Sequence, residues 1–143
     1  MGDAVHLIKL SVGSESVDGL REWQAGRRKE LKRDHSLHIT RMWPRREAEL
    51  LQGGSIFWVI QGFVQCRQRI LRLDEVTGRD GIRRCAIVLE PTLIRTATAR
   101  RRPFQGWRYL PVDDAPPDLP PGREDDDALP PALAGALADI GVL

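Results

Sequence analysis

The feature that most constrains the fold is a long β-type run over residues 55–75. Both of its alternating sets of side chains are rich in apolar residues up to about residue 64. A run of this length exceeds the roughly 3–10 residues of an ordinary strand. We therefore expect it to bend strongly or to bulge near Gly62, where the missing Cβ permits an unusual backbone.

Shorter patterns on either side complete an α+β protein. Ser14 or Ser16 can cap a helix over 17–33, whose apolar stripe is expected to pack on the sheet through Leu20, Trp23 and Leu31. The other expected elements are strands over 4–12, 37–43, 82–90 and 93–98 and a short helix over 45–51. These elements predict an α+β fold with a mixed, mainly antiparallel, bent sheet and flanking helices.

The chain length fits one domain followed by a tail. We predict a single α+β domain over 1–110 and an acidic, proline-rich linker over 111–128. Residues 129–143 carry the apolar stripe of a short helix, which needs a surface to pack on. We expect this helix to lie back on the domain through Leu133, Leu137 and Ile140.

Charge is divided unevenly along the chain. Residues 1–109 hold 21 Lys and Arg against 12 Asp and Glu, a net charge of +9, whereas residues 110–143 hold one Arg against eight acidic residues, a net charge of −7. A basic body favours an anionic partner, and an acidic tail can repel or mimic that partner. A GC-rich genome would produce the same excess of arginine without any selection for binding.

One set of polar and aromatic residues suits recognition of a nucleotide or a nucleic-acid strand. Planar arginine forks bind phosphate, aromatic faces stack on bases, and glutamine pairs with base edges. The candidate binding residues are Arg41, Trp58, Gln65, Arg67, Arg69, Gln105, Trp107, Arg108 and Tyr109.

The same residues also have a structural interpretation. Gln65, Arg67 and Arg69 share one strand parity and are expected to project from one face. The two arginines would then pair with Glu75 or Glu90 across the sheet. In that interpretation the two tryptophans of the set belong to the core.

Metal and thiol chemistry find little support in the sequence. His35 and His38 with Cys66 and Cys85 could make a tetrahedral zinc site, but no Cys-x-x-Cys pair is present. We expect both cysteines to be buried, reduced and metal-free, and we expect no cofactor. No signal peptide and no apolar run of about 20 residues is found, which predicts a cytoplasmic protein without a membrane partner.

Seven short blocks resemble an uncharacterised bacterial family, domain of unknown function 1489. They lie at residues 5–10, 38–41, 53–55, 58–60, 66–70, 89–91 and 104–110. This resemblance covers nearly the whole chain and implies a small standalone cytoplasmic protein with no assigned activity. Residues 53–64 also look like the central hairpin of PUA-like barrels, a group that includes RNA-binding modules. This second resemblance implies a PUA-like partly open barrel with flanking helices as the alternative fold.

Three functions remain open at this point. The first is binding of nucleic acid, RNA or a modified nucleotide, through the Arg, Gln and aromatic surface. The second is a small enzyme that acts on an anionic metabolite, with Cys66 or His38 near the same pocket. The third is a protein-interaction module whose acidic tail is the contact surface.

Overall fold

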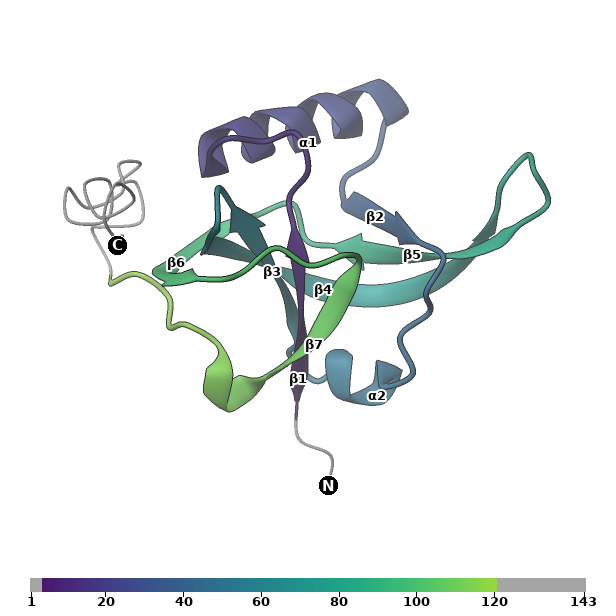
Figure 1. Ribbon diagram of the computed structural model, residues 1–143. Helices are drawn as coiled ribbons and strands as arrows, with labels where there is room; N and C mark the ends of the chain where they lie inside the picture. Colours follow the sequence, from purple (N-terminus) through teal and green to yellow (C-terminus); the bar gives the residue numbers. More distant parts are fainter. Residues whose placement is uncertain (1–3, 121–143) are drawn as a thin grey trace.

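A computed structural model describes residues 4–120 of the chain. Strands and helices alternate as far as β3, and the strands β3 to β7 then follow one another (Figure 1). In chain order they are β1 (Val5–Leu10), α1 (Val17–Leu31), β2 (Ser36–Thr40), α2 (Glu47–Leu50), β3 (Ser55–Ile60), β4 (Phe63–Thr77), β5 (Arg83–Leu89), β6 (Ile94–Arg100), β7 (Trp107–Pro111) and the 3₁₀ turn η1 (Val112–Asp114).

The strands form one seven-stranded sheet in the order β2-β5-β4-β3-β1-β7, with β6 paired to β4 beside this path. Only β1 and β3 pair in parallel among the described strands, and every other pair is antiparallel. The predicted α+β class with a mixed, mainly antiparallel sheet is therefore confirmed. The sheet is open, and it twists until β1 and β7 cross the direction of β4 and β5 (Figure 1).

The long β-type run is a hairpin and not one bent strand. The chain reverses at Gln61 and Gly62, which both have positive φ angles, 54° and 84°. Two consecutive residues with positive φ make the tight turn whose twist matches paired strands. Gly62 thus permits a complete reversal where we expected a bend or a bulge within one strand, and β3 pairs with the first half of β4.

A bulge breaks the expected alternation along β4. Val59 pairs with Val64 and Trp58 with Cys66, so Gln65 is an extra residue in the ladder. The amide of Gln65 donates to the backbone oxygen of Ile60 at 2.7 Å. Gln65 is therefore buried at the turn and does not continue the face of the two arginines that follow it.

Two hydrophobic cores lie on opposite faces of β1, β3 and the start of β4. The larger core contains Leu7, Trp58, Cys66 and Ile87, together with buried residues from α1 and α2. The smaller core gathers buried residues from β1, β3, β4 and β7 on the other face: Ile8, Phe57, Val59, Val64 and Leu110. Both faces of this part of the sheet are thus covered.

Helix α1 covers only part of the larger core. Ser16 caps its first turn by accepting the Gly19 amide at 2.9 Å. The helix buries Val17, Leu20 and Gln24, whereas the predicted core residues Trp23 and Leu31 are 59% and 40% exposed. The expectation for these two was wrong because the second half of the helix lies over a polar pocket and not over the core.

Residues 117–119 lie along the edge of β6. The Ala97 amide donates to the Pro117 oxygen at 2.8 Å, and the Leu119 amide donates to the Arg95 oxygen at 3.0 Å. This part of the predicted linker is therefore tied to the sheet. Residues 121–128 of that linker and the predicted helix over 129–143 lie outside the described residues.

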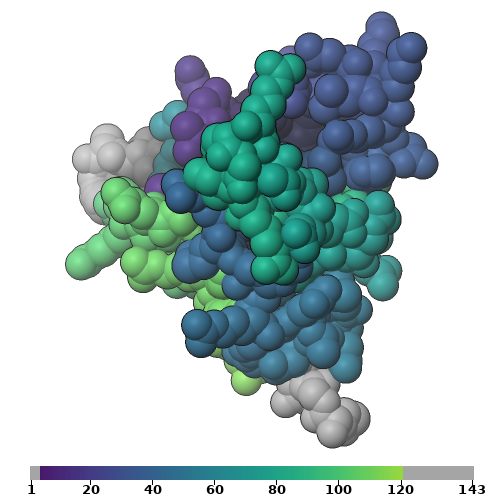
Figure 2. All heavy atoms as spheres, turned by 90° about the vertical axis from the view of Figure 1, so that its right-hand side faces the viewer, coloured from purple at the N-terminus to yellow at the C-terminus, as the bar shows by residue number. Residues whose placement is uncertain are grey.

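The space-filling view shows the turn between β4 and β5 projecting toward the viewer (Figure 2). The end of α1 and strand β2 stand above it, and α2 lies below. None of the helices in the described part of the chain has the length and apolarity needed to cross a membrane.

The turn at Gln61 generates a stability prediction. The left-handed backbone conformation is unfavourable for most L-residues, and asparagine tolerates it better than glutamine does. Gln61→Asn should raise the free energy of unfolding by about 0.5–1 kcal/mol in urea denaturation. Gln52→Asn, at an exposed position without a positive φ, is the control and should change little. Equal effects of the two substitutions would contradict this account of the turn.

Candidate functional site

A pocket of about 740 Å³ lies between α1, β2 and the end of β1. This volume is within the range of pockets that hold small ligands, roughly 300–1,000 Å³. The segment that joins β1 to α1 forms one wall and the strand β2 forms another. The pocket forms because the buried residues of α1 all lie between Val17 and Gln24, so the rest of the helix does not pack on the sheet.

The floor of the pocket is a buried polar network. Gln24 and Gln68 form a reciprocal amide pair, with Nε2 to Oε1 distances of 3.0 and 2.7 Å. Trp58 Nε1 donates to Gln68 Oε1 at 3.0 Å, and Gln68 Nε2 also donates to the Glu90 oxygen at 2.8 Å. Ser36 Oγ donates to Gln24 Oε1 at 3.2 Å. The network is satisfied internally, so it holds the helix at a fixed height above the sheet.

The pocket wall is strongly basic. Lys9, Arg27, Arg28 and Arg33 line it, and Glu15 is the single acidic residue among its described lining residues. Arg28 is oriented by its hydrogen bond to Ser36 Oγ at 2.8 Å. The partial burial of Lys9 lowers the pKa of its ammonium group from the usual value. Such a wall attracts anions.

His38 lies on β2 at the edge of the floor. Its ring meets the Trp58 ring edge-on, with 5.8 Å between the centroids. Burial, with a further contribution from the charge of Lys9, lowers the pKa of His38 to about 4. The imidazole is therefore neutral near pH 7, and its two nitrogens can donate one hydrogen bond and accept another.

The pocket mouth is apolar. Val12, Trp23, Leu31 and Ile39 line it and are 87%, 59%, 40% and 49% exposed. They make up half of the eight large hydrophobic side chains that are exposed in the described part of the chain. A concentration of exposed apolar side chains at a cavity mouth is typical of a surface that is covered by a ligand or another segment. We refer to these four residues as the apolar rim.

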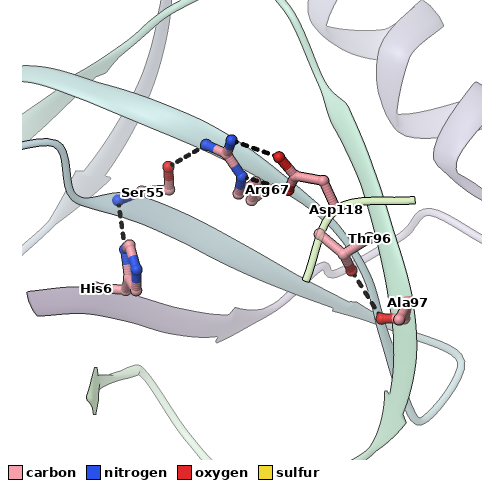
Figure 3. Close-up of polar contacts among 6 residues, drawn as sticks. All are labelled: His6, Ser55, Arg67, Thr96, Ala97 and Asp118. Atoms are coloured by element: carbon pink, nitrogen blue, oxygen red, sulfur yellow. Dashed lines mark hydrogen bonds and ion pairs between the residues drawn. The ribbon is translucent and has the colours of Figure 1, made fainter. Parts of the chain in front are cut away.

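The residues predicted from sequence do not form one site. Arg67 lies on the opposite face of the sheet from the pocket, where it makes a bidentate ion pair with Asp118 at 2.7 and 2.9 Å. Its third contact is to Ser55 Oγ at 2.9 Å, and the Ser55 amide donates to His6 Nδ1 at 2.9 Å (Figure 3). The pairing partner is neither of the two glutamates considered from the sequence. Arg67 thus helps to hold Asp118 beside β6.

The predicted tryptophans are both buried. Trp58 belongs to the pocket floor, whereas Trp107 lies in the larger core and donates its indole N–H to the Met42 oxygen at 2.9 Å. Tyr109 packs on Trp107, with 4.9 Å between the ring centroids, and its hydroxyl accepts the amides of Arg45 and Arg46. Trp107 and Tyr109 are therefore committed to the structure of the β2–α2 connection.

The other predicted residues are spread over the surface. Arg69 is 4.0 Å from Glu90, and Arg108 lies over the Phe104 ring at 5.0 Å. Arg41 and Gln105 are exposed. Of the nine predicted binding residues, Trp58 alone lines the pocket.

Both cysteines are buried and unpaired with each other. Burial raises the pKa of Cys66 to about 12 and that of Cys85 to about 11. Neither sulfur is a thiolate near pH 7, so neither has the reactivity of a catalytic nucleophile. Within residues 4–120 no group of three or more His, Cys, Asp and Glu side chains is arranged to hold a metal ion.

Sequence reasoning missed most of the pocket. None of its basic residues Lys9, Arg27, Arg28 and Arg33 was among the candidate binding residues. The missed signal is Gln24, a polar residue that follows Val17 and Leu20 at spacings of seven and four. A glutamine on the buried stripe of a helix requires a polar partner beneath it.

The family described as a protein of unknown function, DUF1489, matches residues 7–143. This chain belongs to the DUF1489 family. The match confirms the resemblance seen in the sequence, and it extends through the acidic tail to the last residue. Comparison with curated proteins and with solved structures returns no match, and the resemblance to PUA-like barrels gains no support.

The polar floor generates a second prediction. Gln68→Met removes the partners of both Gln24 and Trp58 and leaves buried polar groups unsatisfied, so it should lower the free energy of unfolding by about 2–4 kcal/mol. Gln24→Met should cost less in the Gln68→Met background than in the wild type, because its partner is already absent. Urea denaturation of the four proteins measures this coupling. Gln105→Met, at an exposed position, is the control. Additive effects would show that the amide pair does not join helix and sheet.

Proposed function

We propose that this DUF1489 protein binds a nucleotide, either free or as an unpaired residue of RNA, in the pocket under α1. The observation that carries the proposal is the composition of the pocket: four basic side chains, two tryptophans and a polar floor enclose one volume of about 740 Å³. A nucleotide combines a negative phosphate, a flat base and polar base edges, and each of these has a counterpart there.

The phosphate would lie near the C-terminal end of α1. Arg27, Arg28 and Arg33 come from this end of the helix and the turn after it. Guanidinium groups bind phosphate through paired hydrogen bonds, which are stronger than those between neutral groups. Because Arg28 is already oriented by Ser36, little side-chain freedom is lost when it binds an anion.

The base would lie between the rim and the floor. Trp23 presents an exposed indole at the pocket mouth, and an aromatic face suits stacking on any base. Ser36 and His38 lie deeper and can meet the polar edge of a base. Free nucleotides and single-stranded RNA offer unstacked bases, whereas the bases of a duplex are stacked and paired and cannot enter such a pocket.

The alternative of an enzyme that acts on an anionic metabolite receives less support. A pKa of about 4 makes His38 a weak base at neutral pH, and the pKa values of both thiols are too high for nucleophilic attack. The pocket is therefore better equipped to bind a ligand than to transform one.

A fluorescence titration tests the proposal. The full chain would be titrated with 5′-AMP and with single-stranded oligoadenylate RNA and DNA at several salt concentrations. Arg33→Ala should weaken RNA binding about tenfold and reduce the salt slope by about one phosphate contact. Trp23→Ala should weaken binding by roughly 1–3 kcal/mol with an unchanged salt slope, whereas Trp23→Phe, which keeps a ring, should weaken it less.

Two control variants separate a pocket from a diffuse positive surface. Arg79 lies in the β4–β5 turn, and Arg108 belongs to the surface predicted from sequence; both are exposed and neither lines the pocket. Arg79→Ala and Arg108→Ala should change the affinity by less than about twofold. If either weakens binding as much as Arg33→Ala does, or if no ligand binds at low salt, the proposal is wrong.

A further inference from the structure

We infer that the pocket under α1 selects a nucleotide whose purine base carries an oxo group at C6, as guanine and hypoxanthine do, and that Lys9 reads this group. This selection rests on the proposed function and adds the identity of the base to it. Three features of Lys9 support it: its place beside the pocket floor, the lack of an acidic partner for its ammonium group, and its separation from the arginines of the pocket.

Lys9 lies beside Trp58, the aromatic ring of the pocket floor. The two residues are paired in register across the parallel strands β1 and β3, so their side chains project from the same face of the sheet. His38 meets the same indole from β2, with 5.8 Å between the ring centroids. The strand order places β1 and β2 on opposite sides of β3. A cationic group and a neutral imidazole therefore flank the floor indole.

The ammonium group of Lys9 has no acidic partner within residues 4–120. Its hydrogen bond there is a long contact to the Leu10 backbone oxygen at 3.4 Å, although its side chain is partly buried. The Nε2 atom of His38 is also buried without a hydrogen-bond partner among the described residues. Removing polar groups from water without a partner is unfavourable. Two such groups around one indole indicate the place where the polar edge of a ligand binds.

The basic residues of the pocket fall into two groups. The arginines come from the second half of α1 and the turn after it, whereas Lys9 comes from β1. A chain of hydrogen bonds runs from Arg28 to the indole beside Lys9, through Ser36, Gln24 and Gln68. The polar floor thus connects the two groups. A nucleotide whose phosphate binds the arginines would bring its base to Lys9.

An ammonium group distinguishes an oxo group from an amino group. Lysine has three N–H donors and no acceptor. Guanine presents O6 and N7 as two neighbouring acceptors, and lysine is one of the side chains that bind this pair. Adenine carries an amino group in place of O6, and two donors cannot form a hydrogen bond. Contacts of the phosphate with the arginines and of the base with Trp23 are the same for both bases, so the discrimination depends on Lys9.

Titration of the full chain with inosine 5′-monophosphate (5′-IMP) and 5′-AMP tests this selection, because the two nucleotides differ in the C6 substituent and in the proton on N1. The wild type should bind 5′-IMP about tenfold more tightly than 5′-AMP, and 5′-GMP about as tightly as 5′-IMP. Lys9→Met, which keeps a long unbranched side chain, should weaken 5′-IMP binding about tenfold and 5′-AMP binding by less than about twofold. Lys29→Met removes an exposed lysine of α1 that does not line the pocket, and this matched control should preserve the discrimination.

Each outcome decides the selection. Equal affinities of the wild type for 5′-IMP and 5′-AMP overturn it and leave the proposed function intact, because the pocket still binds a nucleotide. Equal weakening of both nucleotides by Lys9→Met assigns the lysine to phosphate and also overturns it. If none of the three nucleotides binds, the proposed function has failed and the selection fails with it. The comparison of nucleotides on the wild-type chain needs no substitution, so it is decisive even if Lys9→Met does not fold.

Discussion

The amide pair between Gln24 and Gln68 is the interaction on which the site depends. It is the polar contact that joins the middle of α1 to the centre of the sheet, 44 residues away in sequence. An apolar pair at these positions would let the helix settle on the core. The glutamines instead hold it over a polar floor, and the side chains beyond them, from Arg27 to Arg33, face a cavity. Leaving either amide without its partner would lower the free energy of unfolding, because both side chains are buried.

The two faces of the sheet have different roles in this arrangement. One face holds the larger core and the pocket, while the other holds the smaller core and the network around Arg67. Asp118 connects the second face to the start of the tail. Arg67, which was expected to hold phosphate, is instead engaged by Asp118.

Local patterns were sufficient for most elements and insufficient for the site. Alternation predicted most of the strands, and the capping signal predicted the start of α1 with Ser14 or Ser16 as its cap, because these features depend on residues close in sequence. The reversal at Gln61 was missed because a glutamine rarely adopts a positive φ. The face of Arg67 and Arg69 was separated from Gln65 by one extra residue at the bulge, which alternation alone does not reveal. The pocket depends on contacts between α1, β2 and β3, and such pairings are set by the whole sheet.

The four tryptophans provide the most direct test of the central claim, that a nucleotide binds under α1. Trp23 and Trp58 line the pocket, whereas Trp43 and Trp107 pack elsewhere against the larger core. Each indole N–H gives its own NMR signal, so one titration of the isotope-labelled full chain with 5′-AMP reports on both locations. The account predicts that the Trp23 and Trp58 signals move with one binding constant while those of Trp43 and Trp107 stay in place. Movement of the Trp107 signal without the Trp23 signal, or no movement at all, would contradict it.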